Sequence, residues 1–369
     1  MPVKYYIIAG EASGDLHGAN LIKALRAEDP NADIRCWGGD KMAAAGGHVV
    51  KHIRELAFMG FIEVIKHLPT ILGNISFCKQ DILEYKPDVV ILIDYPGFNF
   101  RLFKFIKQHG FKLFYYISPQ LWAWKEGRVK QVKEYVDRMF VIFPFEKAFY
   151  AKHGVEVDFV GHPLLDELGD RGRGTGEDEF QGISQIIALL PGSRKQEIKS
   201  LLPEYLKVIP HFPDYKFVVA GISGLGRDFY TDIIGDARCE IEWDNTYGLL
   251  NSAHAAIVTS GTATLETALH NVPEVICYKA SPLSYYIAKR LIKGIEYIGI
   301  VNLIAGRLVS KELIQADVND QMLILELERL LYAPHRAKML QAYNEVRQLL
   351  GSSGASERAA KLMIGYLGK

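Results

Sequence analysis

A glycine-rich segment near the amino end carries an unusual density of polar side chains. Residues 10–20 follow a short apolar run, so we predict that they form the turn from a strand into a helix. Ligands of open α/β sheets bind at such turns, and glycines let them approach the backbone closely, although a purely structural turn is the alternative. The spacing matches neither GxGxxG nor GxxxxGKS/T, which excludes the dinucleotide and triphosphate fingerprints at this turn. The candidate ligand-binding residues are Glu11, Ser13, His17 and Asn20.

An acidic side chain follows the most apolar run of the first half. Residues 89–93 read Val-Val-Ile-Leu-Ile, and Asp94 comes next in a Pro-Gly turn that also contains Asn99, a candidate substrate contact. A carboxylate at the end of a buried strand is poorly solvated, so its pKa rises and it can act as a base. We interpret Asp94 as a candidate general base, with His17 as the competing choice. The alternative is that Asp94 only caps the helix that begins near Phe98.

Two tryptophans lie two residues apart in the loop after the next predicted strand, residues 112–117. Trp122 and Trp124 are difficult to explain as core residues alone. An indole has an apolar face and a polar edge, which suits contact with a sugar or an acyl chain. The alternative is that both rings fill an interface between two lobes.

Two predicted helix starts in the second half have the features of anion sites. Residues 190–198 and 259–266 each place small residues between an apolar run and a helix. The free N–H groups and the dipole of a helix start bind anions, and the arginine beside the first start suits a diphosphate. The acid of the second start could accept both hydroxyls of a ribose, although acids also stabilise first helical turns in general. The candidate residues are Gly192, Ser193, Arg194, Gly261, Thr262, Ala263 and Glu266.

Short apolar runs alternate with longer amphipathic segments along most of the chain, as in parallel sheets covered by helices. The alternation stops at a segment rich in glycine and charge, and then restarts. We therefore predict an α/β protein with two similar lobes. A helical tail would pack on the first lobe or on a partner subunit of a homodimer. The predicted parts are the first lobe (residues 1–168), a linker (169–183), the second lobe (184–345) and the tail (346–369).

Composition narrows the possible classes of protein. The 369 residues include 43 basic and 43 acidic side chains, so no global field favours nucleic acid. No apolar run approaches the ~20 residues of a membrane span, and the amino end does not resemble a signal peptide, so we expect a cytosolic protein. The four cysteines show neither metal-site nor disulfide spacing. Candidates for contact with an anionic membrane surface are residues 56–72 and the basic Arg101, Lys104 and Lys107; a core helix and a solvated face are the alternatives.

Eight motifs together resemble one family and occur in its order. They are GEASGD at 10–15, DYPGFN at 94–99, SPQLWAW at 118–124, FPFE at 143–146, VGHP at 160–163, LPGSR at 190–194, SGTATLE at 260–266 and NLIAGR at 302–307. Several of them are weak alone, but jointly they are specific. The chain resembles the lipid-A-disaccharide synthases of Gram-negative bacteria over nearly its whole length.

The resemblance implies a GT-B architecture, in which two Rossmann-like lobes face each other across a cleft, and an inverting transfer that needs no metal or cofactor. The donor would be UDP-2,3-diacylglucosamine and the acceptor 2,3-diacylglucosamine 1-phosphate. The products would be a β-1,6-linked disaccharide and UDP, made by a peripheral protein at the cytoplasmic face of the inner membrane. Asp94 or His17 would act as the base, Arg194 would stabilise the departing diphosphate, and Asn302 would help to position the donor.

Other functions share parts of this pattern. Another GT-B enzyme, such as a polyprenyl transferase or a UDP-N-acetylglucosamine epimerase, would not require acylated UDP-glucosamine. A non-catalytic protein that binds nucleotide-sugars or lipids would bind UDP without turnover. A nicotinamide oxidoreductase would need a GxGxxG turn after a strand, and none is present.

Overall fold

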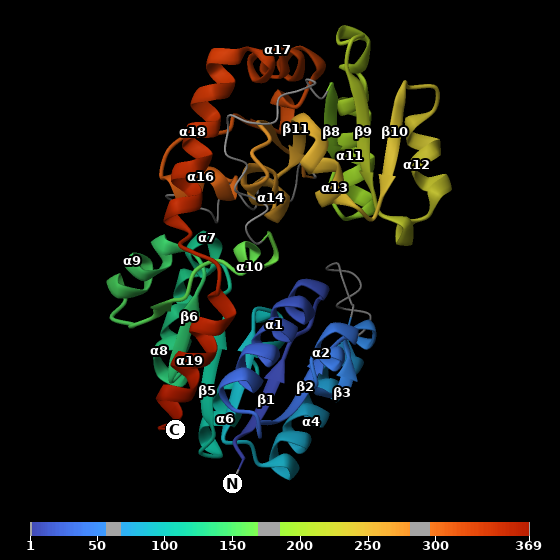
Figure 1. The fold of residues 1–369 in the computed structure, drawn as a ribbon. Coiled ribbons are helices and arrows are strands. Elements are labelled where there is room, and N and C mark those ends of the chain that lie inside the picture. The colour runs from blue at the N-terminus through green and yellow to red at the C-terminus, as the bar shows by residue number, and fades with distance from the viewer. Residues whose placement is uncertain (1, 57–67, 169–184, 281–295, 369) are drawn as a thin grey trace. The chain divides into compact units, whose positions relative to one another are not determined.

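The computed structural model describes residues 2–56, 68–168, 185–280 and 296–368. The chain divides into two compact units, each with its own parallel sheet (Figure 1). Unit 1 comprises residues 1–167 and 350–369, and unit 2 comprises residues 168–349. The predicted linker, residues 169–183, lies outside the described residues.

Unit 1 contains a seven-stranded parallel sheet with the order β3-β2-β1-β4-β5-β6-β7. The chain builds from β1 to one edge and then returns to the middle at β4. The carboxyl ends of β1 and β4 therefore meet at a topological switch point, where sheets of this kind bind ligands. The strands are β1 (Lys4–Ile8), β2 (Asp33–Gly38), β3 (His48–His52), β4 (Val89–Ile93), β5 (Lys112–Tyr116), β6 (Arg138–Val141) and β7 (Asp158–Phe159).

The helices of unit 1 bury the central strands. Every residue of β4 is buried, because helices cover a parallel sheet on both faces. The last helix, α19, packs against α1 of the same chain, and Asp166 caps its start by accepting the N–H groups of Gly354 at 2.6 Å and Ala355 at 3.0 Å. The helices are α1 (Ala12–Glu28), α2 (Asp40–Ala44), α4 (Leu68–Tyr85), α5 (Pro96–Asn99), α6 (Phe103–Gln108), α7 (Leu121–Trp124), α8 (Val129–Tyr135), α9 (Pro144–Lys152), α10 (Leu164–Leu168) and α19 (Ala355–Leu367).

Unit 2 repeats this plan with a six-stranded parallel sheet of order β10-β9-β8-β11-β12-β13, so its switch point lies between β8 and β11. The strands are β8 (Ile186–Leu190), β9 (Lys216–Gly221), β10 (Cys239–Trp243), β11 (Ala253–Thr259), β12 (Glu274–Tyr278) and β13 (Glu312–Ile314). The helices are α11 (Lys195–Leu206), α12 (Arg227–Ile234), α13 (Thr246–Ser252), α14 (Thr262–Leu269), α16 (Ile300–Ala305), α17 (Asp320–Leu331) and α18 (Ala333–Leu349).

The structure confirms the strands that the sequence predicts in the middle of each sheet. The apolar runs at residues 89–93 and 186–190 coincide with β4 and β8. Outer strands such as β10 alternate acidic and apolar residues, and the sequence does not predict them. The residues of the predicted helical tail, 346–369, form the end of α18 and the whole of α19.

Candidate active site

The loops that leave β1 and β4 lie against each other at the switch point of unit 1. A Cβ atom at Gly10 would lie 2.3 Å from Cδ1 of Tyr95, so only glycine allows this close packing. Asp94 and Tyr95 both have positive φ angles, 41° and 48°, and Ile117 after β5 has a φ of 62°. Such backbone conformations are costly for residues other than glycine, and they concentrate at functional sites.

Two hydrogen bonds to the backbone carbonyl of Asp94 hold this residue in place. The donors are Nδ2 of Asn99, at 2.7 Å, and the hydroxyl of Tyr115. Burial and the nearby charge of Glu11 raise the pKa of Asp94 to about 7. The carboxyl group is therefore partly ionised near neutral pH, as a general base should be. The alternative capping role is not observed, because α5 has Tyr95 as its N-cap and no side-chain capping bond.

One face of α1 carries the remaining candidates of the first segment. Ser13, His17 and Asn20 are spaced i, i+4 and i+7 and so share this face. Ser13 is exposed, and the other two are partly buried. Burial lowers the pKa of His17 to about 4, and its Nδ1 lies 4.0 Å from Oε1 of Glu167. His17 is therefore neutral at pH 7 and a weaker base than Asp94.

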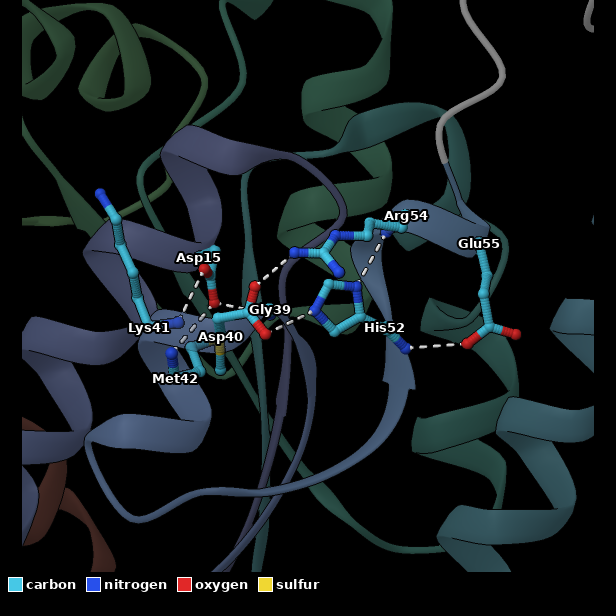
Figure 2. Close-up of polar contacts among 8 residues, drawn as sticks. All are labelled: Asp15, Gly39, Asp40, Lys41, Met42, His52, Arg54 and Glu55. Atoms are coloured by element: carbon cyan, nitrogen blue, oxygen red, sulfur yellow. Dashed lines mark hydrogen bonds and ion pairs between the residues drawn. The ribbon is translucent and has the colours of Figure 1, made fainter. Parts of the chain in front are cut away.

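Asp15 points away from this face and has a structural role. Its carboxylate accepts hydrogen bonds from three backbone N–H groups, those of Gly39 (2.6 Å), Lys41 (3.2 Å) and Met42 (3.1 Å). Figure 2 shows how these bonds tie Asp15 to the start of α2. Among the polar residues of the first segment, Asp15 therefore supports the fold. Ser13, His17 and Asn20 form a candidate site on a different face of α1.

Two buried polar residues after other strands of this sheet are missing from the predicted set. Glu146 is fully buried in α9, and its Oε2 accepts the N–H of Phe143 at 2.9 Å. Burial raises the pKa of Glu146 to about 8, and the charge of Asp94 contributes. His162 follows β7, and burial lowers its pKa to about 3. The FPFE and VGHP motifs contain these residues, but nothing in the motifs reveals their burial.

Trp122 packs edge-on against Phe145, with ring centroids 5.1 Å apart. Its indole Nε1 is one of several buried polar atoms of unit 1 that have no hydrogen-bond partner in the described part of the chain. Each such atom costs ~1–3 kcal/mol, so a group of them indicates a place for water or a polar ligand. The side chain of Trp124 lies outside the described structure. The atoms are Nδ1 of His17, Oδ1 of Asn99, Nε1 of Trp122 and Oε1 of Glu146.

The first predicted anion site follows β8 in unit 2. Gly192 has a φ of 105°, and a Cβ atom there would lie 2.6 Å from Oε2 of Glu197. Arg194 is the N-cap of α11 and is largely exposed, with Nη1 3.1 Å from Oε1 of Glu197. Oε2 of Glu197 also accepts the N–H of Ser193 at 3.3 Å. The first anion site therefore combines the Gly192 turn, Arg194 and the start of α11. The carboxylate of Glu197 contacts both Ser193 and Arg194 and holds this arrangement.

The second predicted anion site lies where α14 begins. A Cβ atom at Gly261 would meet no atom within 4 Å, so the backbone there is open to a ligand. Thr262 is exposed, and Ala263 and Glu266 are partly buried. Burial raises the pKa of Glu266, and the hydroxyl of Tyr247 donates to its Oε1 at 3.4 Å. Open backbone and a carboxylate thus occur within two turns of one helix.

A cavity of about 860 Å³ lies beside the carboxyl ends of β8, β11, β12 and β13. Its position is the switch point of unit 2, and its volume is in the range of small-ligand sites. The cavity extends from Arg194 of the first anion site to the end of β11, which precedes the second anion site. Its walls include Arg194, Glu197, Thr259, Ser260, Lys279 and Gln315.

Asn302 is fully buried, and both the Nδ2 and the Oδ1 atom of its side-chain amide form hydrogen bonds with other protein groups. Its Nδ2 donates to the carbonyl of Ser310 at 2.7 Å and to Oε1 of Glu312 at 2.8 Å. Its Oδ1 accepts the N–H groups of Val309 at 2.7 Å and Ser310 at 2.9 Å. Asn302 therefore holds the turn that leads into β13, and direct contact with a ligand would require these bonds to exchange.

Comparison with known proteins identifies the family. Residues 5–364 match the family of lipid-A-disaccharide synthetases. The chain belongs to this family. Lipid-A-disaccharide synthases of Trichlorobacter lovleyi and Geobacter sulfurreducens are each 40% identical to it, over 99% and 98% of this chain and 98% and 97% of their own.

Solved structures share the fold at low sequence identity. UDP-GlcNAc 2-epimerase from Neisseria meningitidis, bound to UDP-GlcNAc, has a TM-score of 0.66 at 14% identity and covers 99% of this chain and 100% of its own. The calicheamicin glycosyltransferase has a TM-score of 0.65 at 16% identity and covers 100% of this chain and 99% of its own. These matches confirm the predicted GT-B class with two Rossmann-like units, and together with the family they make the chain a glycosyltransferase.

Three further observations bear on the sequence predictions. Cys36, Cys78, Cys239 and Cys277 are free thiols. Among the described residues, no group of three or more His, Cys, Asp or Glu side chains is arranged to hold a metal ion. None of the helices in the described ranges is long and apolar enough to cross a membrane.

Proposed function

We propose that this glycosyltransferase joins two acylated glucosamines. It transfers 2,3-diacylglucosamine from UDP-2,3-diacylglucosamine to 2,3-diacylglucosamine 1-phosphate, which gives the β-1,6-linked disaccharide and UDP. The observation that carries the proposal is a carboxyl group with a pKa of about 7 at one switch point, in a chain whose other switch point has an arginine-lined cavity. The family match supports the acylated substrates.

Asp94 is the proposed base of the reaction. In an inverting transfer the 6-hydroxyl oxygen of the acceptor bonds to the anomeric carbon as the bond to UDP breaks, and the hydroxyl proton passes to a base. The raised pKa of Asp94 lets the carboxylate take this proton near neutral pH. His17, with a pKa of about 4, is the competing base.

Unit 2 supplies the proposed donor site. Arg194 and the backbone N–H groups after Gly192 and Gly261 stabilise the negative charge that develops on the departing diphosphate. Ser193, Thr262 and Ala263 provide that backbone. Glu266 accepts the ribose hydroxyls. Asn302 acts on the donor indirectly, because it holds the turn before β13.

Unit 1 supplies the proposed acceptor site. Buried polar atoms without partners favour a ligand that can form hydrogen bonds with them, and a sugar has many hydroxyl groups. Ser13 and Asn20 share a face with His17 and extend this polar surface along α1. The indole of Trp122 offers both a ring face and an unpaired N–H to a sugar.

Exposed apolar side chains on α4 are the proposed membrane contact. Leu72 is 54% exposed, Phe77 is 45% exposed and Leu83 is 39% exposed, so one helix carries three large apolar side chains in contact with solvent. Arg101 and Lys104 are also exposed in the same unit and would favour an anionic surface. Residues 57–67 of the predicted membrane segment lie outside the described residues. We propose that the protein is peripheral on the cytoplasmic face of the inner membrane.

The direct test is incubation with both acylated substrates, with UDP release and the disaccharide product followed by mass. We expect one UDP per disaccharide. Omission of the acceptor should abolish disaccharide formation. Equal turnover of unacylated UDP-N-acetylglucosamine, or its epimerisation, would contradict the proposed substrates, and UDP binding without any turnover would indicate a non-catalytic binding protein.

A further inference from the structure

The cavity of unit 2 has a second cationic side chain besides Arg194. Lys279 follows the last residue of β12, at the carboxyl edge of the sheet, and lines the cavity. Its Nζ lies 2.9 Å from Oε1 of Glu204, and its side chain is 31% exposed. The lysine is therefore held at the cavity wall by an ion pair instead of extending freely into solvent.

Glu204 is shared by two lysines. Its Oε1 faces Lys279, whereas its Oε2 lies 2.7 Å from Nζ of Lys207. Partial burial acts to raise the pKa of Glu204, but the two ammonium groups lower it below its ordinary value. Since Lys207 would remain with Glu204, Lys279 can leave this carboxylate without leaving a buried charge unpaired.

The charge of the proposed donor favours additional fixed cations besides Arg194. A departing nucleoside diphosphate gains negative charge as its bond to the sugar breaks, and the transfer is faster where fixed cations meet that charge. Arg194 is 67% exposed and already pairs with Glu197, so solvent screens part of its effect. Among the described residues that line the cavity, Arg194 and Lys279 are the cations, and Lys279 is the less exposed of the two.

We propose that Lys279 is a second ligand of the donor diphosphate, which exchanges its bond to Glu204 for a phosphate oxygen when the donor binds. The assignment rests on the proposed function of unit 2 as the donor site. Glu204 then serves as the resting partner that keeps the ammonium group at the cavity wall. The chain offers a matched comparison, because Lys207 pairs with the same carboxylate but does not line the cavity.

The test compares the Lys279→Gln and Lys207→Gln variants in the full-length protein. Binding of UDP and of uridine is measured by titration calorimetry for both variants and the parent, and thermal unfolding checks that all three fold. The Lys279→Gln variant loses a hydrogen bond to the charged diphosphate. It should therefore bind UDP roughly 10- to 100-fold more weakly than the parent, while its binding of uridine changes little. Lys207→Gln should weaken UDP binding far less than Lys279→Gln does, because Lys207 does not line the cavity, and it should leave uridine binding unchanged.

The outcomes separate this assignment from the function on which it rests. If the parent binds neither UDP nor uridine, the donor site itself is wrong and the role of Lys279 fails with it. If the parent binds UDP and Lys279→Gln binds it equally well, only the role of Lys279 fails. Equal losses for UDP and uridine, or equal losses in both variants, would mean that the lysine acts through folding or through Glu204 and would also overturn the assignment.

Discussion

The pH dependence of the transfer should report the ionisation of Asp94. If this carboxylate is the base, the rate should rise with pH through about 7 and level off above it, because only the ionised form accepts the proton. Glu11 contributes to the raised pKa through its negative charge, so Glu11→Gln should lower the pKa of Asp94. Glu11 is exposed and screened, so we expect a shift of about half a pH unit.

This shift predicts a rate difference between Glu11→Gln and the parent below neutral pH and none above it. At pH 6 the ionised fraction of Asp94 would rise from about 0.1 to about 0.25, so Glu11→Gln should be roughly 2- to 3-fold faster than the parent. At pH 8 both forms are almost fully ionised, and the rates should agree. The variant gains activity only where the parent base is mostly protonated.

The assay is the initial rate of UDP release from pH 5 to 9 with both substrates well below saturation, so that the profile reports the pKa of the free protein. Glu84→Gln removes an exposed acid on α4 and should leave the profile unchanged. Asp94→Asn should lower the plateau roughly 10²- to 10⁴-fold while the protein still folds. A rate that is already close to its plateau at pH 5 and does not respond to Glu11→Gln would point to His17, and near-normal turnover by Asp94→Asn would refute the assignment of the base.

Two other predictions test the packing of the site and the membrane face. Gly10→Ala should lower turnover strongly and should also lower thermal stability, because its methyl group would lie 2.3 Å from a tyrosine ring in the loop of the base and the ring or the backbone must move. Gly97→Ala, which meets nothing within 4 Å, is the control, and equal activity of both variants would contradict the packing argument. The double variant Leu72→Ser and Phe77→Ser should sediment less with anionic vesicles, whereas Leu308→Ser, 51% exposed in unit 2, should not; equal sedimentation would exclude α4 as the membrane contact.

Central strands and the loops that leave them could be predicted because their signals are local. The run at residues 89–93 is apolar at every position, as expected for a strand buried on both faces, and Asp94 follows it directly. Because β1 and β4 are neighbours in the parallel sheet, the loops that follow them lie side by side. The candidate residues that follow β1, β4, β8 and β11 directly lie near the two switch points for this reason.

Residues whose role depends on distant contacts could not be predicted in this way. Glu146 resembles an ordinary acid in a first helical turn, and only the structure shows that it is fully buried. Lys279 gives no signal beyond a lysine after a strand, because its partner Glu204 is 75 residues away in the chain. Asn302 belongs to a motif, but its hydrogen bonds within the protein identify it as a residue that holds a turn.

The two units satisfy their polar groups in different ways, and the difference fits different steps of the chemistry. Unit 1 leaves Asn99 and Glu146 with unpaired buried atoms beside Asp94, and the poor solvation that makes these atoms costly also raises the pKa of the base. Unit 2 instead pairs Arg194 and Lys279 with carboxylates of α11. A base needs an environment that solvates its charge poorly, whereas a site that binds and releases a diphosphate needs cations whose resting partners can be exchanged for phosphate oxygens.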